Sequence, residues 1–118
     1  MMYESIPGTN RPKWDLEEKD AELSEKFKKS FSEVIDPELG LNIIQLGLIR
    51  NVSEREDSIL VKMILTTPFC PYGPAMLEST REKAEAVSPK PIVLDLGMEM
   101  WDFSMMEEGL GGEWGLYG

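Results

Sequence analysis

The stretch that most limits the fold of this chain is ILVKMILT, residues 59–66, a nearly unbroken run of apolar and β-branched residues. Such a short run is typical of a strand covered on both faces rather than of a helix. The charged residues of EREDS, 54–58, precede it, and a proline-containing turn follows it. We therefore expect a central, largely buried strand that needs other strands beside it and helices above it.

Periodic apolar residues predict two helices around this strand. The first apolar set is spaced by four, four and three residues and consists of Leu23, Phe27, Phe31 and Val34. This spacing predicts an amphipathic helix over residues 20–35, with Asp20 as its N-cap and its end before Pro37. A second apolar stripe over residues 76–87 predicts another helix.

Two further segments are expected as strands. LIRNVS, residues 48–53, predicts a strand that pairs with 59–66 as an antiparallel hairpin. IVLDLGMEM, residues 92–100, alternates well and predicts a half-buried strand. Its apolar face is expected to carry Ile92, Leu94, Leu96, Met98 and Met100.

The order helix–strand–strand–helix–strand predicts an α/β (α+β) fold. We expect a two-layer sandwich in which the helices pack on one face of a small mixed sheet. The expected organisation is a flexible N-terminal arm over residues 1–19, one domain over 20–103 and a Gly-rich C-terminal tail over 104–118. Residues 36–47, which lack a clean period, are expected as a turn.

Composition removes several classes of function. A net charge of −10, from 12 basic and 22 acidic residues, argues against nucleic-acid binding. The absence of histidine excludes Ser-His-Asp and Cys-His catalysis, and one cysteine cannot build a Cys/His zinc site or an internal disulfide. No apolar run is long enough for a membrane span and no secretory signal opens the sequence, so a soluble, cytoplasmic protein is expected.

The single cysteine lies in LTTPFCPYGP, residues 65–74. If Pro71 is the first helical residue, Cys70 is the N-cap, and the amides of Tyr72 and Gly73 face its sulfur. That arrangement stabilises a thiolate. The alternative is that Cys70 is a small buried apolar residue, and both interpretations stay open at this point.

Polar residues near the cysteine have the same two interpretations. Asp36 and Glu38 either belong to a solvated turn after the first helix, or lie beside the thiol if the two turns meet at one end of the sheet. Thr66 and Thr67 are either strand-forming residues or hydroxyls that line a pocket.

Together, the two turns resemble a known family. VIDPELGLNIIQLGLIRNV, residues 34–52, followed by LTTPFCP, 65–71, and by Trp101 at a strand end, is similar to the iron–sulfur cluster assembly factor family. This family comprises the PaaD-like and SufT-like metal–sulfur cluster biosynthetic proteins. The resemblance covers about residues 23–103.

The resemblance implies a small α/β domain that helps to mature iron–sulfur clusters or to deliver them to apo-proteins. It implies that Cys70 is the functionally central residue, and transient iron–sulfur ligation is one of the roles open to this thiol. The residues that it implies around the same pocket are Asp36, Glu38, Leu39, Thr66 and Thr67. The implied partners are other iron–sulfur assembly proteins and apo-protein clients.

Ligand chemistry limits how such a function can work. A stable cluster takes four thiolate or imidazole ligands, whereas one chain offers one thiolate and a symmetric homodimer offers two. We therefore expect no stably bound cofactor, and either a labile cluster or an adaptor role. Two alternatives remain: a small thiol enzyme with Cys70 as nucleophile and Asp36 or Glu38 as acid or base, and a purely structural interaction module.

Overall fold

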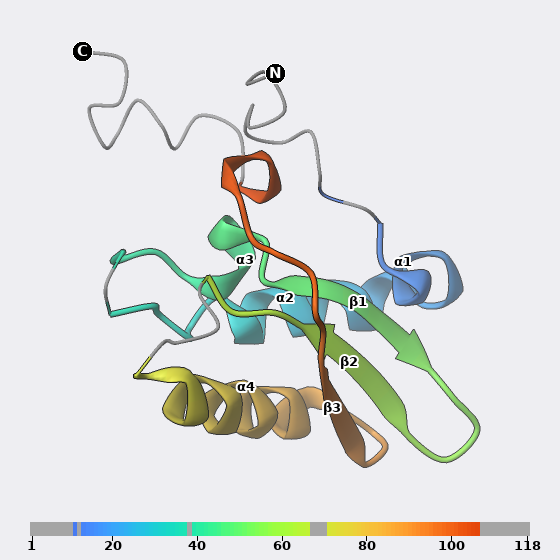
Figure 1. The fold of residues 1–118 in the computed structure, drawn as a ribbon. Coiled ribbons are helices and arrows are strands. Elements are labelled where there is room, and N and C mark those ends of the chain that lie inside the picture. The colour runs from blue at the N-terminus through green and yellow to red at the C-terminus, as the bar shows by residue number, and fades with distance from the viewer. Residues whose placement is uncertain (1–10, 12, 38, 67–70, 107–118) are drawn as a thin grey trace.

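The computed structural model describes residues 11, 13–37, 39–66 and 71–106. Its elements are α1 (Asp15–Lys19), α2 (Ala21–Phe31), α3 (Ile43–Leu46), β1 (Ile49–Glu54), β2 (Ile59–Met63), α4 (Gly73–Val87), β3 (Ile92–Leu96) and the 3-10 turn η2 (Phe103–Met105). The sheet order is β1-β2-β3; β1 and β2 are antiparallel, and β2 and β3 are parallel. The predicted α+β fold with a mixed sheet is confirmed, and α2 and α4 lie on the same side of the sheet (Figure 1).

The central strand β2 carries the core of the domain. Its alternate residues Ile59, Val61 and Met63 are fully buried, while Lys62 points to solvent. Val61 pairs with Val52 of β1 on one side and with Leu94 of β3 on the other. Burying a side chain of this size contributes about 1.5–3 kcal/mol, so this row of pairs is a main source of stability.

Helix α2 begins where the sequence predicts and ends earlier. The carboxylate of Asp20 accepts a hydrogen bond from the amide of Leu23 at 3.0 Å, which confirms the N-cap. The expected end at residue 35 is wrong, because the helix ends at Phe31. Beyond it the chain folds back, and Ile35 forms a β-bridge with Asn42 instead of continuing the helix.

Residues 36–47 contain a helix that the periodicity did not predict. Asn42 and Gln45 form a reciprocal capping box at the start of α3: the Gln45 amide donates to Asn42 Oδ1 at 2.7 Å, and the Asn42 amide to Gln45 Oε1 at 2.9 Å. Gly47 ends α3 at φ 74°. A Cβ at Gly47 would clash with the carbonyl oxygen of Met105, so glycine is required there for space as well as conformation.

The domain is longer at both ends than residues 20–103. Trp14 is 5% exposed and Leu16 is fully buried, so the expectation of a flexible arm up to residue 19 needs correction. The Trp14 indole packs edge-on against Phe31 and donates from Nε1 to the carbonyl of Ile49 at 3.2 Å. At the other end Met106 is fully buried, so the tail expected from residue 104 starts later.

Strands β2 and β3 are both shorter than predicted. β2 ends at Met63 rather than at residue 66, and the amide of Gly97 makes the final bond of the parallel pair to the Met63 carbonyl at 2.7 Å. Since β2 offers no further partner, β3 ends at Leu96. Met98 and Met100, expected on the buried face, are 95% and 74% exposed.

Truncation of Trp14 tests the corrected N-terminal boundary. Trp14→Ala should lower the free energy of unfolding by about 3–5 kcal/mol, because a buried indole and its hydrogen bond are both lost. Trp14→Phe, which keeps most of the apolar contact, should lower it by about 1 kcal/mol. Urea unfolding followed by circular dichroism measures both, with the exposed neighbour Lys13→Ala as control. An unchanged midpoint for Trp14→Ala would contradict the packing of this segment.

Glu17 makes the stability of the same region depend on pH. Burial raises the pKa of the Glu17 carboxyl, but the hydrogen bond from the Trp14 amide and the ammonium group of Lys28 outweigh it, so the pKa lies below 4.5. A lowered folded-state pKa stabilises the fold above the unfolded pKa, and this contribution disappears as the pH falls through the folded pKa. The difference in unfolding free energy between wild type and Glu17→Gln should therefore be present at neutral pH and shrink as the pH falls from 4.5 through the lowered folded-state pKa. A difference that is constant across this range would show that the ionised carboxylate contributes nothing.

Candidate functional site

The two turns that carry the predicted site residues meet at one end of the sheet. Asp36 follows α2 and Thr66 follows β2, yet the Thr66 hydroxyl donates to Asp36 Oδ2 at 3.5 Å. The carboxylate is almost fully buried, with 1% of the residue exposed. The sequence left open whether the two turns meet, and the contact between Asp36 and Thr66 shows that they do.

Asp36 also shapes its own turn. Its Oδ1 accepts a hydrogen bond from the Leu39 amide at 3.3 Å, and its main-chain carbonyl accepts one from the Gly40 amide at 2.8 Å. Gly40, at φ 72°, allows the chain to reverse so that the Asp36 amide can donate to the Leu41 carbonyl at 2.9 Å. The carboxylate therefore links the backbone of one turn to a side chain of the other.

The structure describes half of the predicted site. Asp36, Leu39 and Thr66 are brought together as described above, whereas Glu38, Thr67 and Cys70 lie outside the described residues. Thr66 is the last described residue before the cysteine, and α4 begins shortly after it. The structure therefore describes the chain on both sides of the segment that carries Cys70, up to Thr66 before it and from Pro71 after it.

The condition for a helix cap at Cys70, that Pro71 is the first helical residue, is not met. Helix α4 begins at Gly73, its N-cap is Tyr72, and Pro74 lies in its first turn. The Met76 amide donates to the Tyr72 carbonyl at 2.9 Å, which starts the helical ladder after Pro71. Either proline fits the first turn of a helix, and the one used here is Pro74. Tyr72 and Gly73 are therefore the N-cap and the first residue of α4, not the second and third helical residues.

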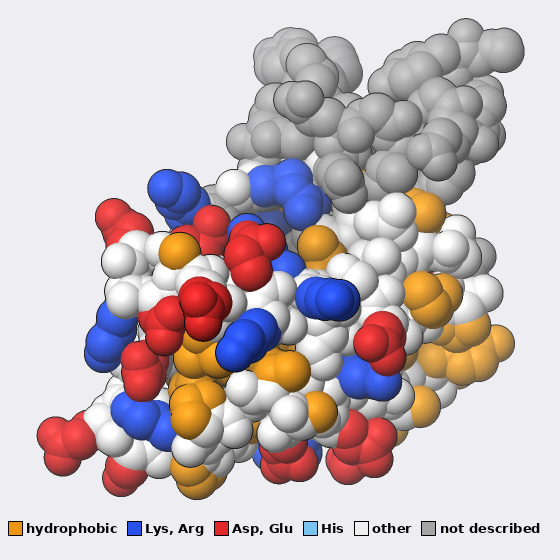
Figure 2. Space-filling view, turned by 180° about the vertical axis from the view of Figure 1, so that it is seen from behind, with side chains coloured by type: hydrophobic (Ala, Val, Ile, Leu, Met, Phe, Trp, Pro, Cys, Tyr) orange, Lys and Arg blue, Asp and Glu red, His pale blue; other side chains and the backbone are white. Residues whose placement is uncertain are grey.

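Exposed apolar side chains surround the meeting point of the two turns. Ile35 is 50%, Leu39 36% and Tyr72 44% exposed. Ile35, Pro37 and Tyr72 help to line a shallow pocket of about 260 Å³ between the first turn and the start of α4. Figure 2 shows apolar side chains gathered at this end of the molecule. Exposed apolar patches of this kind mark surfaces that bind other proteins.

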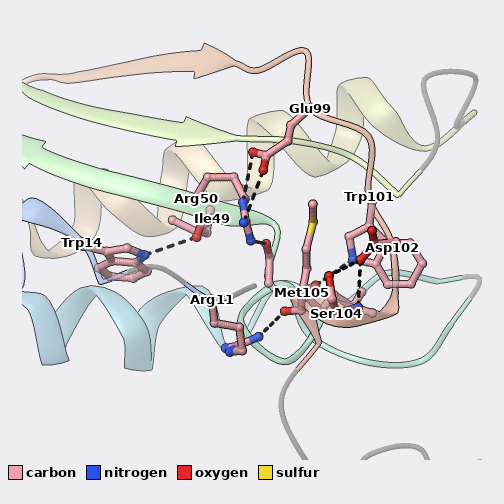
Figure 3. Close-up of polar contacts among 11 residues, drawn as sticks. Arg11, Trp14, Ile49, Arg50, Glu99, Trp101, Asp102, Ser104 and Met105 are labelled. Carbon is pink, nitrogen blue, oxygen red and sulfur yellow. Dashed lines mark hydrogen bonds and ion pairs between the residues drawn. The ribbon is translucent and has the colours of Figure 1, made fainter. Parts of the chain in front are cut away.

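A second polar network, which the sequence did not indicate, fixes the chain at the same end of the sheet (Figure 3). Arg50, 6% exposed, donates to the Gly47 carbonyl at 3.0 Å and forms an ion pair with Glu99 at 3.2 Å. Trp101 Nε1 donates to the Leu46 carbonyl at 2.8 Å. An isolated Arg in a strand carries no sequence signal for such a role, whereas Trp101 belongs to the motif noted above.

The described residues contain no cluster of side chains that could bind a metal ion. Within residues 11, 13–37, 39–66 and 71–106, no group of three or more potential metal-binding side chains converges. In the same part of the chain, no helix is long and apolar enough to cross a lipid bilayer.

Comparison with known proteins identifies the family. A family model described as iron–sulfur cluster assembly protein matches residues 28–92. The chain belongs to this family. The match includes both turns and the whole of β1, β2 and α4.

Named relatives support the same assignment. An Fe-S protein maturation auxiliary factor of Porphyromonas gingivalis is 37% identical over 90 residues, which cover 74% of this chain and 86% of the relative. The Fe-S protein maturation auxiliary factor YitW of Bacillus subtilis is 34% identical over 74 residues, 62% of this chain and 70% of the relative.

Solved structures show the same fold. A domain of unknown function, DUF59, from Bacillus anthracis superimposes with a TM-score of 0.72 at 22% identity, over 84% of this chain and 97% of the other. A conserved hypothetical protein from Thermotoga maritima gives a TM-score of 0.66 at 28% identity, over 77% of this chain and 92% of the other.

The link between the turns can be measured by a double-mutant cycle. Asp36→Ala should lower the free energy of unfolding by about 1–3 kcal/mol, because buried donors lose their acceptor. Thr66→Val removes only the hydroxyl, and it should cost less in the Asp36→Ala background than in wild type, by about 0.5–1 kcal/mol. Chemical unfolding of the four proteins gives this coupling energy. Strictly additive effects would mean that the two residues do not interact.

Proposed function

We propose that this protein is a non-enzymatic factor in the maturation of iron–sulfur proteins, which acts through Cys70 as an adaptor or transient carrier. The observation that supports it most directly is the contact between Asp36 and Thr66, which places the two family motifs at one end of the sheet. The relatives named as maturation auxiliary factors support the general role. Cys70 is the single thiol of the chain, and it follows Thr66 within the second motif.

Transient handling fits this chain better than storage. A cluster takes four thiolate or imidazole ligands, and the sequence supplies one cysteine and no histidine. A cluster held here would need further ligands from a second copy, a small thiol or the receiving protein. Such a cluster would be labile, and in the proposed role that lability allows hand-over.

The exposed apolar side chains support a protein partner. Ile35, Leu39 and Tyr72 lie on the two turns that flank the proposed site. A client or assembly protein that covers them would also come close to the segment that carries Cys70. The partners in this proposal are therefore other assembly proteins and apo-protein clients.

The rival role as a thiol enzyme receives less support from the site. A general base must be able to take a proton from the thiol, but the carboxylate of Asp36 is buried and already accepts hydrogen bonds from Thr66 and Leu39. Asp36 is therefore better placed to hold the turns together than to shuttle protons.

Anaerobic reconstitution with iron and sulfide tests the carrier form of the proposal. Wild type should acquire visible absorption that Cys70→Ser lacks, and it should pass the cluster to an apo-ferredoxin. Glu85→Ala, an exposed position near the end of α4 and away from both turns, is the control and should behave as wild type. If neither wild type nor Cys70→Ser binds iron, the carrier role is wrong and the adaptor role is left.

Complementation separates the adaptor from a structural module. In cells that lack this protein, the activity of a cluster-dependent enzyme should be restored by wild type and by Glu85→Ala but not by Cys70→Ser. Restoration by Cys70→Ser at equal protein level would show that the thiol is dispensable. That result would favour the structural-module alternative and overturn the proposal.

A further inference from the structure

An apolar groove runs beside β3 and borders the proposed site at Thr66. We call it the methionine groove. Its lining residues are Leu65, Thr66, Leu96, Gly97, Met98, Glu99, Met100 and Trp101, and its volume is about 270 Å³. Within the described structure Leu96 is 49%, Met98 95% and Met100 74% exposed. A cluster of this size on a protein surface usually has an occupant, and methionine surfaces adapt to varied apolar side chains.

The neighbouring edge of the sheet can add a further strand. The Pro91 carbonyl accepts from the Ile59 amide, and the Gly97 amide donates to the Met63 carbonyl, so odd-numbered residues of β3 face β2. Alternate residues direct their backbone groups to opposite sides, so Ile92, Leu94 and Leu96 face the outer edge. Arg81 Nη1 donates to the Ile92 carbonyl at 3.2 Å. No described residue bonds the outward groups of Leu94 and Leu96, which lie next to the methionine groove.

The sequence after Met106 has a pattern that matches this surface. Residues 107–118 read EEGLGGEWGLYG, with a glycine-rich first half and an apolar second half. Trp114 and Leu116 are two residues apart and therefore lie on one side of an extended chain. Met98 and Met100 have the same spacing. An extended segment along β3 could thus place its indole and leucine over the two methionines.

The segment after Met106 starts close enough to the methionine groove to reach it. Trp101, in the wall of the groove, bonds Leu46, and Arg11 joins the carbonyls of Ile44 and Met105, so η2 lies at the α3 end of the groove (Figure 3). Met98 precedes Met106 by as many residues as Trp114 follows it. The stretch from Met98 to Met106 contains η2 and is therefore shorter than an extended chain. The stretch from Met106 to Trp114, if extended, spans up to about 26 Å, which is long enough to return to Met98.

We propose that residues 110–118 of this chain dock along the outer edge of β3, with Trp114 and Leu116 in the methionine groove. The tether favours this occupant over a second copy, since a linked segment has an effective concentration in the millimolar range. Two copies that met along β3 would each bring a net charge of −10 to the interface. The inference does not depend on the proposed function.

Methionine oxidation in the full-length chain tests the docking. Wild type and the double variant Trp114→Ser/Leu116→Ser are treated with dilute hydrogen peroxide, and sulfoxide at each methionine is followed by mass spectrometry. Met98 and Met100 should oxidise several-fold faster in the double variant, while Met76, 4% exposed within α4, should be unchanged. Glu113→Ser, which alters the same segment without removing its apolar residues, should match wild type.

Two results of the oxidation experiment would overturn the proposal, and a third contradiction could come from NMR. Equal oxidation rates of Met98 and Met100 in wild type and the double variant would show that Trp114 and Leu116 do not cover them. Protection that is lost on dilution would assign the groove to a second copy. Faster oxidation of Met76 as well would show that the double variant had lost its fold. Methyl NMR of the wild-type protein would then decide the question. Random-coil chemical shifts of the Met98 and Met100 methyl groups that do not change in Trp114→Leu would contradict docking.

Discussion

The arrangement of this domain depends on the carbonyl end of α3. A helix of only one turn does not persist alone; carbonyls of α3 are bound by side chains from two distant segments, and the Gly47 carbonyl is bound by a side chain at the start of the next strand. The donors are Arg11 before α1, Arg50 in β1 and Trp101 after β3. These contacts hold both ends of the described chain against the sheet, and they fix the end of the loop that carries Asp36.

The candidate site follows from that arrangement. With its far end held at α3, the loop can bury the Asp36 carboxylate and present it to Thr66 at the end of β2. The described residues of the site offer position and apolar surface rather than acid–base chemistry. These features support the proposed role of bringing other components together around a thiol, whereas composition alone excluded only histidine-dependent catalysis and could not indicate a partner.

The sequence predicted what periodicity can encode and missed what depends on contacts. Both long helices, the hairpin and the order of elements were predicted, and so was the condition under which Asp36 and Thr66 meet. Helix α3 was missed although its capping residue Asn42 is visible, since one turn has no period. Trp14 was missed because a lone aromatic residue has none either. Met98 was placed in the sheet because the alternation continues beyond the end of the partner strand.

The parallel pairing of β2 with β3 also sets an order of events during synthesis. β1 and β2 can form their hairpin as soon as both are made, whereas β3 can pair only after the crossover through α4 has been completed. The segment with Cys70 lies inside that crossover, between β2 and α4. Both motifs of the candidate site are therefore synthesised before the third strand, so the sheet at whose end they meet is completed only after residues 92–96 have been added.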